Sequence, residues 1–109
     1  MLDKYYLRCK EVSEPVGILT VDIENDYFGF EENDAYEGQL PTFLAYPDAP
    51  MPIDRKIKMW VLGRAPEPNY TMINTLIKKA GLKSYDAYGF FKYNKGQFIP
   101  DKFYVEVIE

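Results

Sequence analysis

Histidine is absent from this chain of 109 residues, and cysteine occurs once, as Cys9. Without histidine the chain cannot contain a Ser-His-Asp or Cys-His catalytic relay, an imidazole acid or base, or a His-ligated zinc or iron site. One cysteine cannot form an internal disulfide or a zinc finger. Several catalytic classes are thereby excluded, and no motif in the chain indicates a cofactor.

Long apolar segments are also missing. No stretch approaches the roughly 20 apolar residues of a membrane-spanning helix, and the first ten residues lack the apolar core of a signal peptide. A lone reduced thiol fits the cytoplasm, and Cys9, in a predicted strand, is expected to be buried. We therefore expect a cytoplasmic protein that does not bind membranes.

The composition predicts one folded domain. Hydrophobic residues make up 47% of the chain and charged residues 28%, which is typical of globular proteins. A chain of this length can bury one hydrophobic core, so we expect a single domain over residues 1–109.

Alternating apolar and polar residues predict two N-terminal strands, at residues 5–12 and 16–25. In the second strand Leu19, Val21 and Ile23 share the face that we expect to be buried. Pro15 and Gly17 interrupt any helix between the two runs, and a short connection between extended runs favours a hairpin.

The middle of the chain contains many helix and strand breakers. Residues 26–54 hold two glycines and four prolines, so we expect an irregular segment with a short extended piece at residues 39–46. The prolines at residues 47–52 indicate a rigid connector. Residues 56–62 then alternate apolar and polar side chains, which predicts a third strand with Ile57, Met59 and Val61 on one face.

One amphipathic helix is expected after Asn69, a suitable N-cap residue, and it should end at Gly81. Its apolar stripe is made of Met72, Ile73, Leu76, Ile77 and Ala80, which we expect to be buried against a sheet.

The C-terminal third is predicted to be a hairpin. An aromatic-rich strand at residues 85–93 would turn at residues 94–96 and pair with a strand at residues 97–107. The expected fold is α+β, a mostly antiparallel sheet with one amphipathic helix packed on one face. The element order is then β-β-loop-β-α-β-β, in two layers.

Positive charge is missing from the segment 11–54, which contains eleven carboxylates and no Lys or Arg. The first ten residues carry three basic and one acidic side chain, and residues 55–109 carry ten and five, so that the net charge is -4. The carboxylates of the acidic segment are Glu11, Glu14, Asp22, Glu24, Asp26, Glu31, Glu32, Asp34, Glu37, Asp48 and Asp54. Such polarity bears on the choice of partner more than on the fold.

Aromatic side chains lie among these carboxylates. Aromatics offer rigid contact area, and carboxylates around them steer a cationic partner. The sequence therefore predicts a non-enzymatic binding protein that docks a basic protein surface through residues of about 26–46, in the manner of a mobile-element or phage accessory or inhibitor protein. The candidate interaction residues are Tyr27, Phe28, Phe30, Glu31, Glu32, Asp34, Tyr36 and Glu37. An alternative is that the aromatics only anchor a long loop to the core.

Two other functions remain open. The acidic cluster could serve a small carboxylate- or divalent-metal-dependent enzyme, although the spacing of a calcium-binding EF-hand is not met, because Tyr27 stands where glycine is required. The basic half could bind single-stranded nucleic acid on a platform of aromatic side chains, which would consist of Trp60, Tyr88, Phe90, Phe91 and Tyr93. The acidic isoelectric point of about 4.9 disfavours the nucleic-acid alternative.

Overall fold

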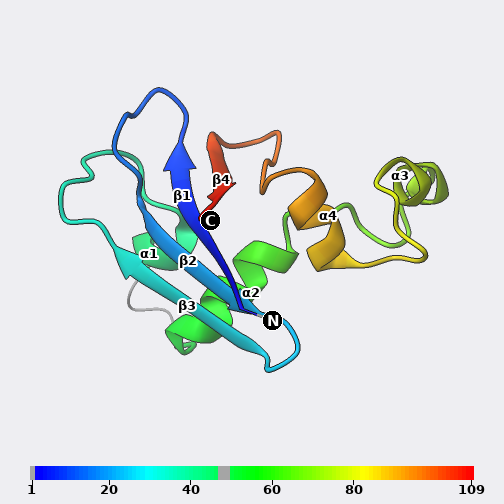
Figure 1. Cartoon of the computed structure of the whole chain (residues 1–109), viewed down its shortest axis with the longest axis horizontal. Helices are drawn as coiled ribbons and strands as arrows, with labels where there is room; N and C mark the ends of the chain where they lie inside the picture. Colours follow the sequence, from blue (N-terminus) through cyan, green and yellow to red (C-terminus); the bar gives the residue numbers. More distant parts are fainter. Residues whose placement is uncertain (1, 47–49) are drawn as a thin grey trace.

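Four strands and four helices make up the fold in a computed structural model, which describes residues 2–46 and 50–109 (Figure 1). In chain order they are β1 (Asp3–Cys9), β2 (Gly17–Asp22), β3 (Tyr27–Glu32), α1 (Thr42–Ala45), α2 (Ile53–Leu62), α3 (Ile73–Lys79), α4 (Ala87–Tyr93) and β4 (Phe103–Val107). The strands form one antiparallel sheet in the order β3-β2-β1-β4. The predicted α+β class is therefore confirmed.

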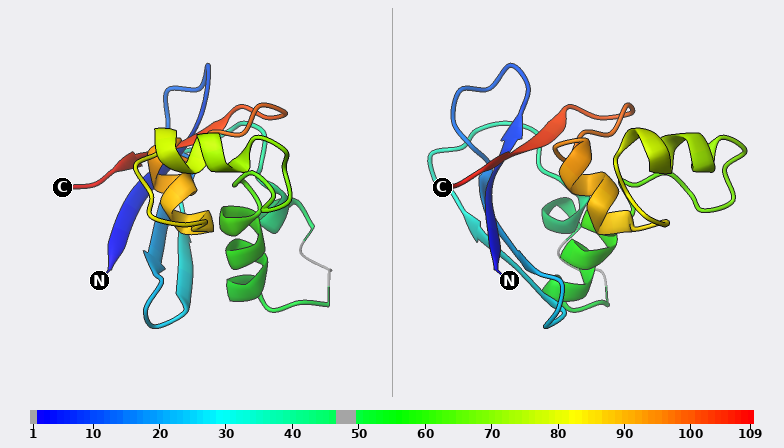
Figure 2. Two further views of the ribbon diagram at one scale, coloured as in Figure 1. Left: turned by 90° about the vertical axis from the view of Figure 1, so that its right-hand side faces the viewer. Right: turned by 45° about the vertical axis from the view of Figure 1, so that its right-hand side comes forward.

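One face of the sheet forms the core, and all the helices of the described residues lie on that side (Figure 2). Alternate residues of β1 are buried, including Leu7 and Cys9, and β2 follows the same pattern at Leu19 and Val21. This confirms the N-terminal hairpin, the period of 2 in both strands, and the burial of Cys9. The expected burial of Ile23 is wrong, because Ile23 lies beyond the end of β2 and is 44% exposed.

A row of aromatic rings joins the helices to the sheet. Phe30 of β3 contacts Phe43 of α1 with ring centroids 5.2 Å apart, and Phe43 contacts Trp60 of α2 at 5.3 Å. Trp60 then reaches Phe103 of β4 at 6.1 Å. All three contacts are edge-to-face, the arrangement in which the positive ring edge meets the negative ring face. The row therefore spans the core from one edge strand to the other.

Arg64, just after α2, is the one charged residue buried among those described, with 6% of its surface exposed. Its guanidinium forms two hydrogen bonds to the Asp101 carboxylate, at 2.8 and 2.6 Å. It also donates to the backbone oxygens of Gly96 and Phe103, and it stacks on Trp60 with its central carbon 4.1 Å from the ring centroid. One side chain thus ties α2 to the connection before β4 and to β4 itself.

The expected third strand at residues 56–62 is wrong, because this segment lies within helix α2. The buried residues are Ile57, Val61 and Arg64, which follow helical spacing, whereas Met59 is 62% exposed. In a short apolar run the strand pattern and the helix pattern share positions, so alternation alone did not decide between them. Asp54 in the first turn favours the helix through its dipole.

The expected C-terminal hairpin is also wrong. Residues 87–93 form α4, which begins at the N-cap Asp86, whose carboxylate accepts a hydrogen bond from the Gly89 N–H at 3.0 Å. The expected turn at residues 94–96 instead ends this helix, with Lys95 and Gly96 at φ +54° and +69°. β4 pairs with β1, so the first and last strands of the chain are neighbours.

The segment 26–54 is more regular than expected. It contains β3, and the piece expected to be extended at residues 39–46 holds α1. β2 and β3 are joined by a tight turn in which Asn25 bonds to Asp22 and Asp26 adopts φ +52°. The proline connector at residues 47–52 falls partly on residues 47–49, which lie outside the described residues, as does Asp48.

The predicted helix over residues 70–80 is present as α3, and its C-terminus is as expected. Gly81 has φ +73°, and the N–H groups of Gly81 and Leu82 bond to Lys78 and Ile77. The N-cap position is Met72, not Asn69. The expected burial against the sheet is wrong. Leu76 is only half-buried, and α3 makes no close backbone approach to another described helix or strand (Figure 1).

We predict that Arg64→Ala lowers the free energy of unfolding by about 3–5 kcal/mol, because it leaves the Asp101 carboxylate without its buried partner. The matched control is Arg55→Ala, which removes an exposed ion pair to Asp26 and should cost about 0–1 kcal/mol. Urea unfolding measures both. Equal losses in the two variants would show that the Arg64 network does not stabilise the fold.

The same ion pair predicts a pH dependence of stability. Burial raises the pKa of Asp101, but hydrogen bonds from Arg64 and from the Phe103 N–H lower it by more, so the net pKa lies below the ordinary 3.8. A carboxyl group whose pKa is lower in the folded state stabilises the fold at pH values above its ordinary pKa. This stabilisation is lost progressively as the pH falls from the ordinary pKa through the pKa of the folded state. The stability difference between the wild type and Asp101→Asn should therefore narrow below pH 3.8. A constant difference would contradict this.

Candidate functional site

Many exposed carboxylates gather at one end of the sheet. The β1–β2 connection and the segment after β3 both lie there (Figure 1). Asn33 joins the two, since its side chain donates to the Pro15 oxygen at 2.9 Å and its backbone N–H donates to the Val16 oxygen at 3.1 Å. We call the following residues the acidic end: Glu14, Glu31, Glu32, Asp34 and Glu37.

All five side chains of the acidic end are exposed, and none of them forms an ion pair with any residue that the structure describes. Two cations near this end pair with other carboxylates: Arg8, which also donates to the Ser13 oxygen, pairs with Glu106, and Lys102 pairs with Glu11. The negative charge at this end is therefore not compensated by direct contacts within the described chain.

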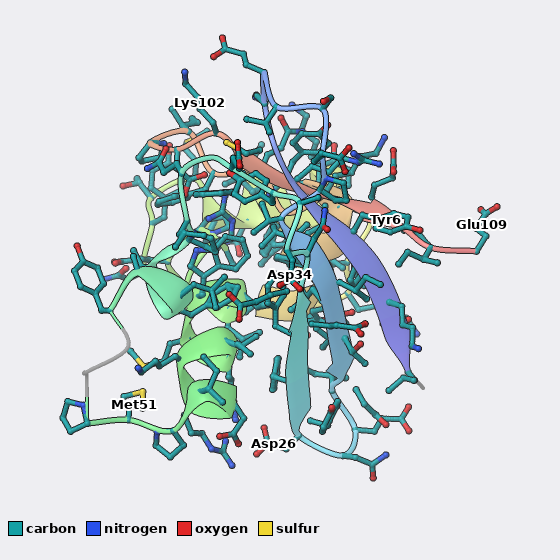
Figure 3. All side chains as sticks on the ribbon, turned by 90° about the vertical axis from the view of Figure 1, so that its left-hand side faces the viewer. Tyr6, Asp26, Asp34, Met51, Lys102 and Glu109 are labelled. Carbon is teal, nitrogen blue, oxygen red and sulfur yellow. The ribbon has the colours of Figure 1, made fainter. Side chains whose placement is uncertain are left out.

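Asp26 lies at the opposite end of β3 from Asp34 and has a different environment (Figure 3). Asp26 accepts hydrogen bonds from Lys58 at 2.7 Å and from Arg55 at 2.9 Å, both from α2. These bonds lower the pKa of Asp26. The acidic segment of the sequence is thus divided into an uncompensated part and a part that holds α2 near the β2–β3 turn.

The four candidate aromatics do not form one exposed patch. Phe28 is 2% exposed, and Phe30 is half-buried against Phe43 and the core. Tyr27 is 53% exposed, but it stands at the far end of β3 from Glu32, with its ring over Gly29 on the open face. Most of the aromatic surface is therefore unavailable to a partner at the acidic end.

Tyr36 anchors the acidic end to the core. Its ring packs against the core, its N–H bonds to the Asn33 oxygen at 3.0 Å, and its hydroxyl donates to the Gln39 oxygen at 2.5 Å. Burial, with the adjacent Cys9 thiol, raises the pKa of Tyr36 to about 12. At neutral pH the hydroxyl is protonated, as in an ordinary tyrosine, and can donate this bond. The arrangement holds the backbone of the acidic end in one conformation.

The aromatics of the basic half are mostly inside the protein. Tyr88, Phe90 and Phe91 of α4 are buried, and Trp60 is half-buried beneath Arg64. Tyr93 alone among the five is well exposed, at 46%. Side chains in the core cannot stack on bases.

A buried chain of hydroxyl groups was not anticipated from the sequence. The Tyr5 hydroxyl lies 2.6 Å from the Tyr88 hydroxyl, which in turn donates to the Asp3 carboxylate at 2.7 Å. Burial is the main cause that raises the pKa of both tyrosines. Because these residues are 83 and 85 positions apart in the sequence, no local signal links them.

Asp3 and Tyr88 also line a cavity of about 660 Å³ between α4 and the β2–β3 turn, with Glu24, Asp86 and Lys92.

No group of three or more Cys, Asp or Glu residues in the described part of the chain is arranged to hold a metal ion. No described helix combines the length and apolar character needed to cross a membrane.

The fold therefore defines an α+β protein with an open four-stranded antiparallel sheet and an uncompensated acidic end. No protein-family model, no curated protein and no solved structure matches the chain.

We predict that Tyr88→Phe lowers the free energy of unfolding by about 1–3 kcal/mol, because it leaves the buried Tyr5 hydroxyl without an acceptor. Tyr5→Phe should lower the free energy of unfolding by a smaller amount, since Tyr88 keeps its hydrogen bond to Asp3. The double variant should cost less than the sum of the two, and thermal or urea unfolding of the three proteins measures this. Additive losses would mean that the two hydroxyl groups are not coupled.

Proposed function

We propose that this protein is a binding module that docks a basic protein surface on its acidic end. The observation that carries the proposal is the group of five exposed carboxylates without ion pairs on two linked segments. Like charges at one end of a molecule repel, and a cationic surface relieves that repulsion.

The rigidity of the acidic end supports the proposal. The hydrogen bonds of Asn33 and Tyr36 hold the backbone that carries Asp34 and Glu37, and the Asn33 side chain also accepts from the Ala35 N–H at 3.1 Å. A surface that is already ordered loses little conformational entropy when a partner binds. These contacts favour recognition by a fixed array of charges over recognition by a flexible tail.

Burial supports a smaller set of docking residues than the eight candidates. Phe28 and Phe30 contribute to the core, and Tyr36 supports the backbone from below. The docking contacts are then made by the carboxylates, with Tyr27 as a separate exposed aromatic on the open face. An interaction dominated by charge gains association rate more than affinity, and its range is about 8 Å at physiological salt.

Neutralising the acidic end tests the proposal. The variant Glu31→Gln, Glu32→Gln, Asp34→Asn and Glu37→Gln should stay folded, because the side chains are exposed and unpaired. Wild-type protein and the variant are immobilised, and basic proteins retained from an extract of the native host are identified by mass spectrometry. A purified partner should then associate at least tenfold more slowly with the variant, and raised salt should slow the wild type.

The control removes two exposed carboxylates elsewhere, Glu67→Gln and Glu109→Gln, and should leave association nearly unchanged. If the four-site variant and the control retain the same proteins at the same rates, the acidic end is not the docking surface.

A further inference from the structure

The outer edge of the sheet at β4 is only partly covered. The Lys10 N–H bonds to the Lys102 oxygen, and the Ile108 N–H bonds to the Lys4 oxygen, so the even-numbered residues of this strand bond toward β1. In an antiparallel pair every second residue bonds to the partner strand, and the residues between them point their N–H and C=O groups away from it. Val105 and Val107 therefore direct their N–H and C=O groups to the outside of the sheet.

The beginning of this edge is closed. Arg64 bonds to the Phe103 oxygen, and the Val105 N–H donates to the Lys95 oxygen at 2.8 Å. Beyond that point the edge is open. Within residues 2–46 and 50–109, no hydrogen bond is made by the Val105 C=O or by the N–H and C=O of Val107.

An apolar cavity of about 490 Å³ runs beside the open part of the edge. Val107 lies on the same face of β4 as the buried Val105, yet it is 64% exposed. Tyr5 and Val105 form the apolar wall, while Lys92 and Lys95 border the cavity from the end of α4. Figure 1 shows the connection from α4 crossing to β4 where that strand begins, at the same end as the hydrogen bond from the Val105 N–H to the Lys95 oxygen.

The two lysines supply the charge of this site. Lys92 and Lys95 are exposed and form no ion pair with any carboxylate in the described residues. The unsatisfied strand edge, the apolar wall and the two cations lie together, and their chemistry matches a peptide strand that ends in a carboxylate.

We propose that the open edge of β4 binds the C-terminal end of an extended peptide, which adds to the sheet antiparallel to β4 and places its terminal carboxylate at Lys92 and Lys95. The Val105 C=O and the N–H and C=O of Val107 bond to the peptide backbone. The last and third-last side chains of the peptide face the apolar wall, and the side chain between them faces the open side of the sheet near Glu106.

Two features determine the end and the direction of the peptide. The turn at Lys95 and Gly96 occupies the space next to Val105, so an added strand cannot continue past it and must end there. A strand antiparallel to β4 reaches this turn with its C-terminus, whose negative charge the lysines attract. A parallel strand would bring its N-terminal ammonium group to the same lysines, which repel it.

The test uses the whole chain and a fluorescein-labelled peptide of sequence Gly-Ser-Thr-Val-Thr-Val with a free C-terminal carboxylate. Fluorescence anisotropy measures its affinity and that of the same peptide with a C-terminal amide. Loss of a charge-assisted hydrogen bond should weaken binding about 10- to 100-fold for the amide. Lys92→Gln with Lys95→Gln should weaken binding of the free acid by a similar factor and leave the amide nearly unaffected.

The matched control is Lys78→Gln with Lys79→Gln on α3, which removes the same charge away from the cavity and should leave both affinities unchanged. Equal binding of acid and amide, or equal effects of the two lysine pairs, would overturn carboxylate capture. Absence of binding by either peptide would overturn the site. The four-site variant of the acidic end should bind the free acid normally, so the two proposals fail independently.

Discussion

The burial of one positive charge constrains the arrangement of the protein. Arg64 is stable inside only because Asp101, two backbone oxygens and the Trp60 ring surround its guanidinium. These groups come from α2, from the connection before β4 and from β4 itself. The end of α2 and the start of β4 must therefore come together when the chain folds. With α2 held in this way, its ring Trp60 continues the aromatic row that reaches β3 through α1.

The parts of the fold that were predictable depend on local information. In β1 and β2 a side chain is buried or exposed according to a period of 2, so residues 5–9 and 17–22 indicate both the strand and its inner face. The end of α3 was predictable because only glycine adopts positive φ there at little cost, and Gly81 has that conformation. The hairpin of β1 with β2 followed from the short connection between them.

The predictions that were wrong concern parts of the fold that depend on contacts between residues far apart in the sequence. The runs that became α2 and α4 fit a strand as well as a helix, and packing against the sheet decided between them. Nothing near Arg64 in the sequence distinguishes it from the other cations of residues 55–109, because its partner Asp101 lies 37 positions away. At the candidate site, the uniform charge was visible in the sequence. The burial of Phe28 and Phe30 was not, because it follows from β3 being a strand, in which these two rings face inward while Tyr27 and Glu31 face outward.

The position of α3 has a thermodynamic consequence. The segment of residues 66–86 leaves the body of the protein and returns to it, and its base is closed by the Tyr85 hydroxyl, which donates to the Pro66 oxygen at 2.7 Å, and by the contact of Tyr85 with Phe90. Opening of this segment breaks neither a strand pairing nor a bond of Arg64. We therefore expect it to open as a cooperative unit of its own, whose amides exchange with solvent through a partial opening that costs less free energy than unfolding the sheet.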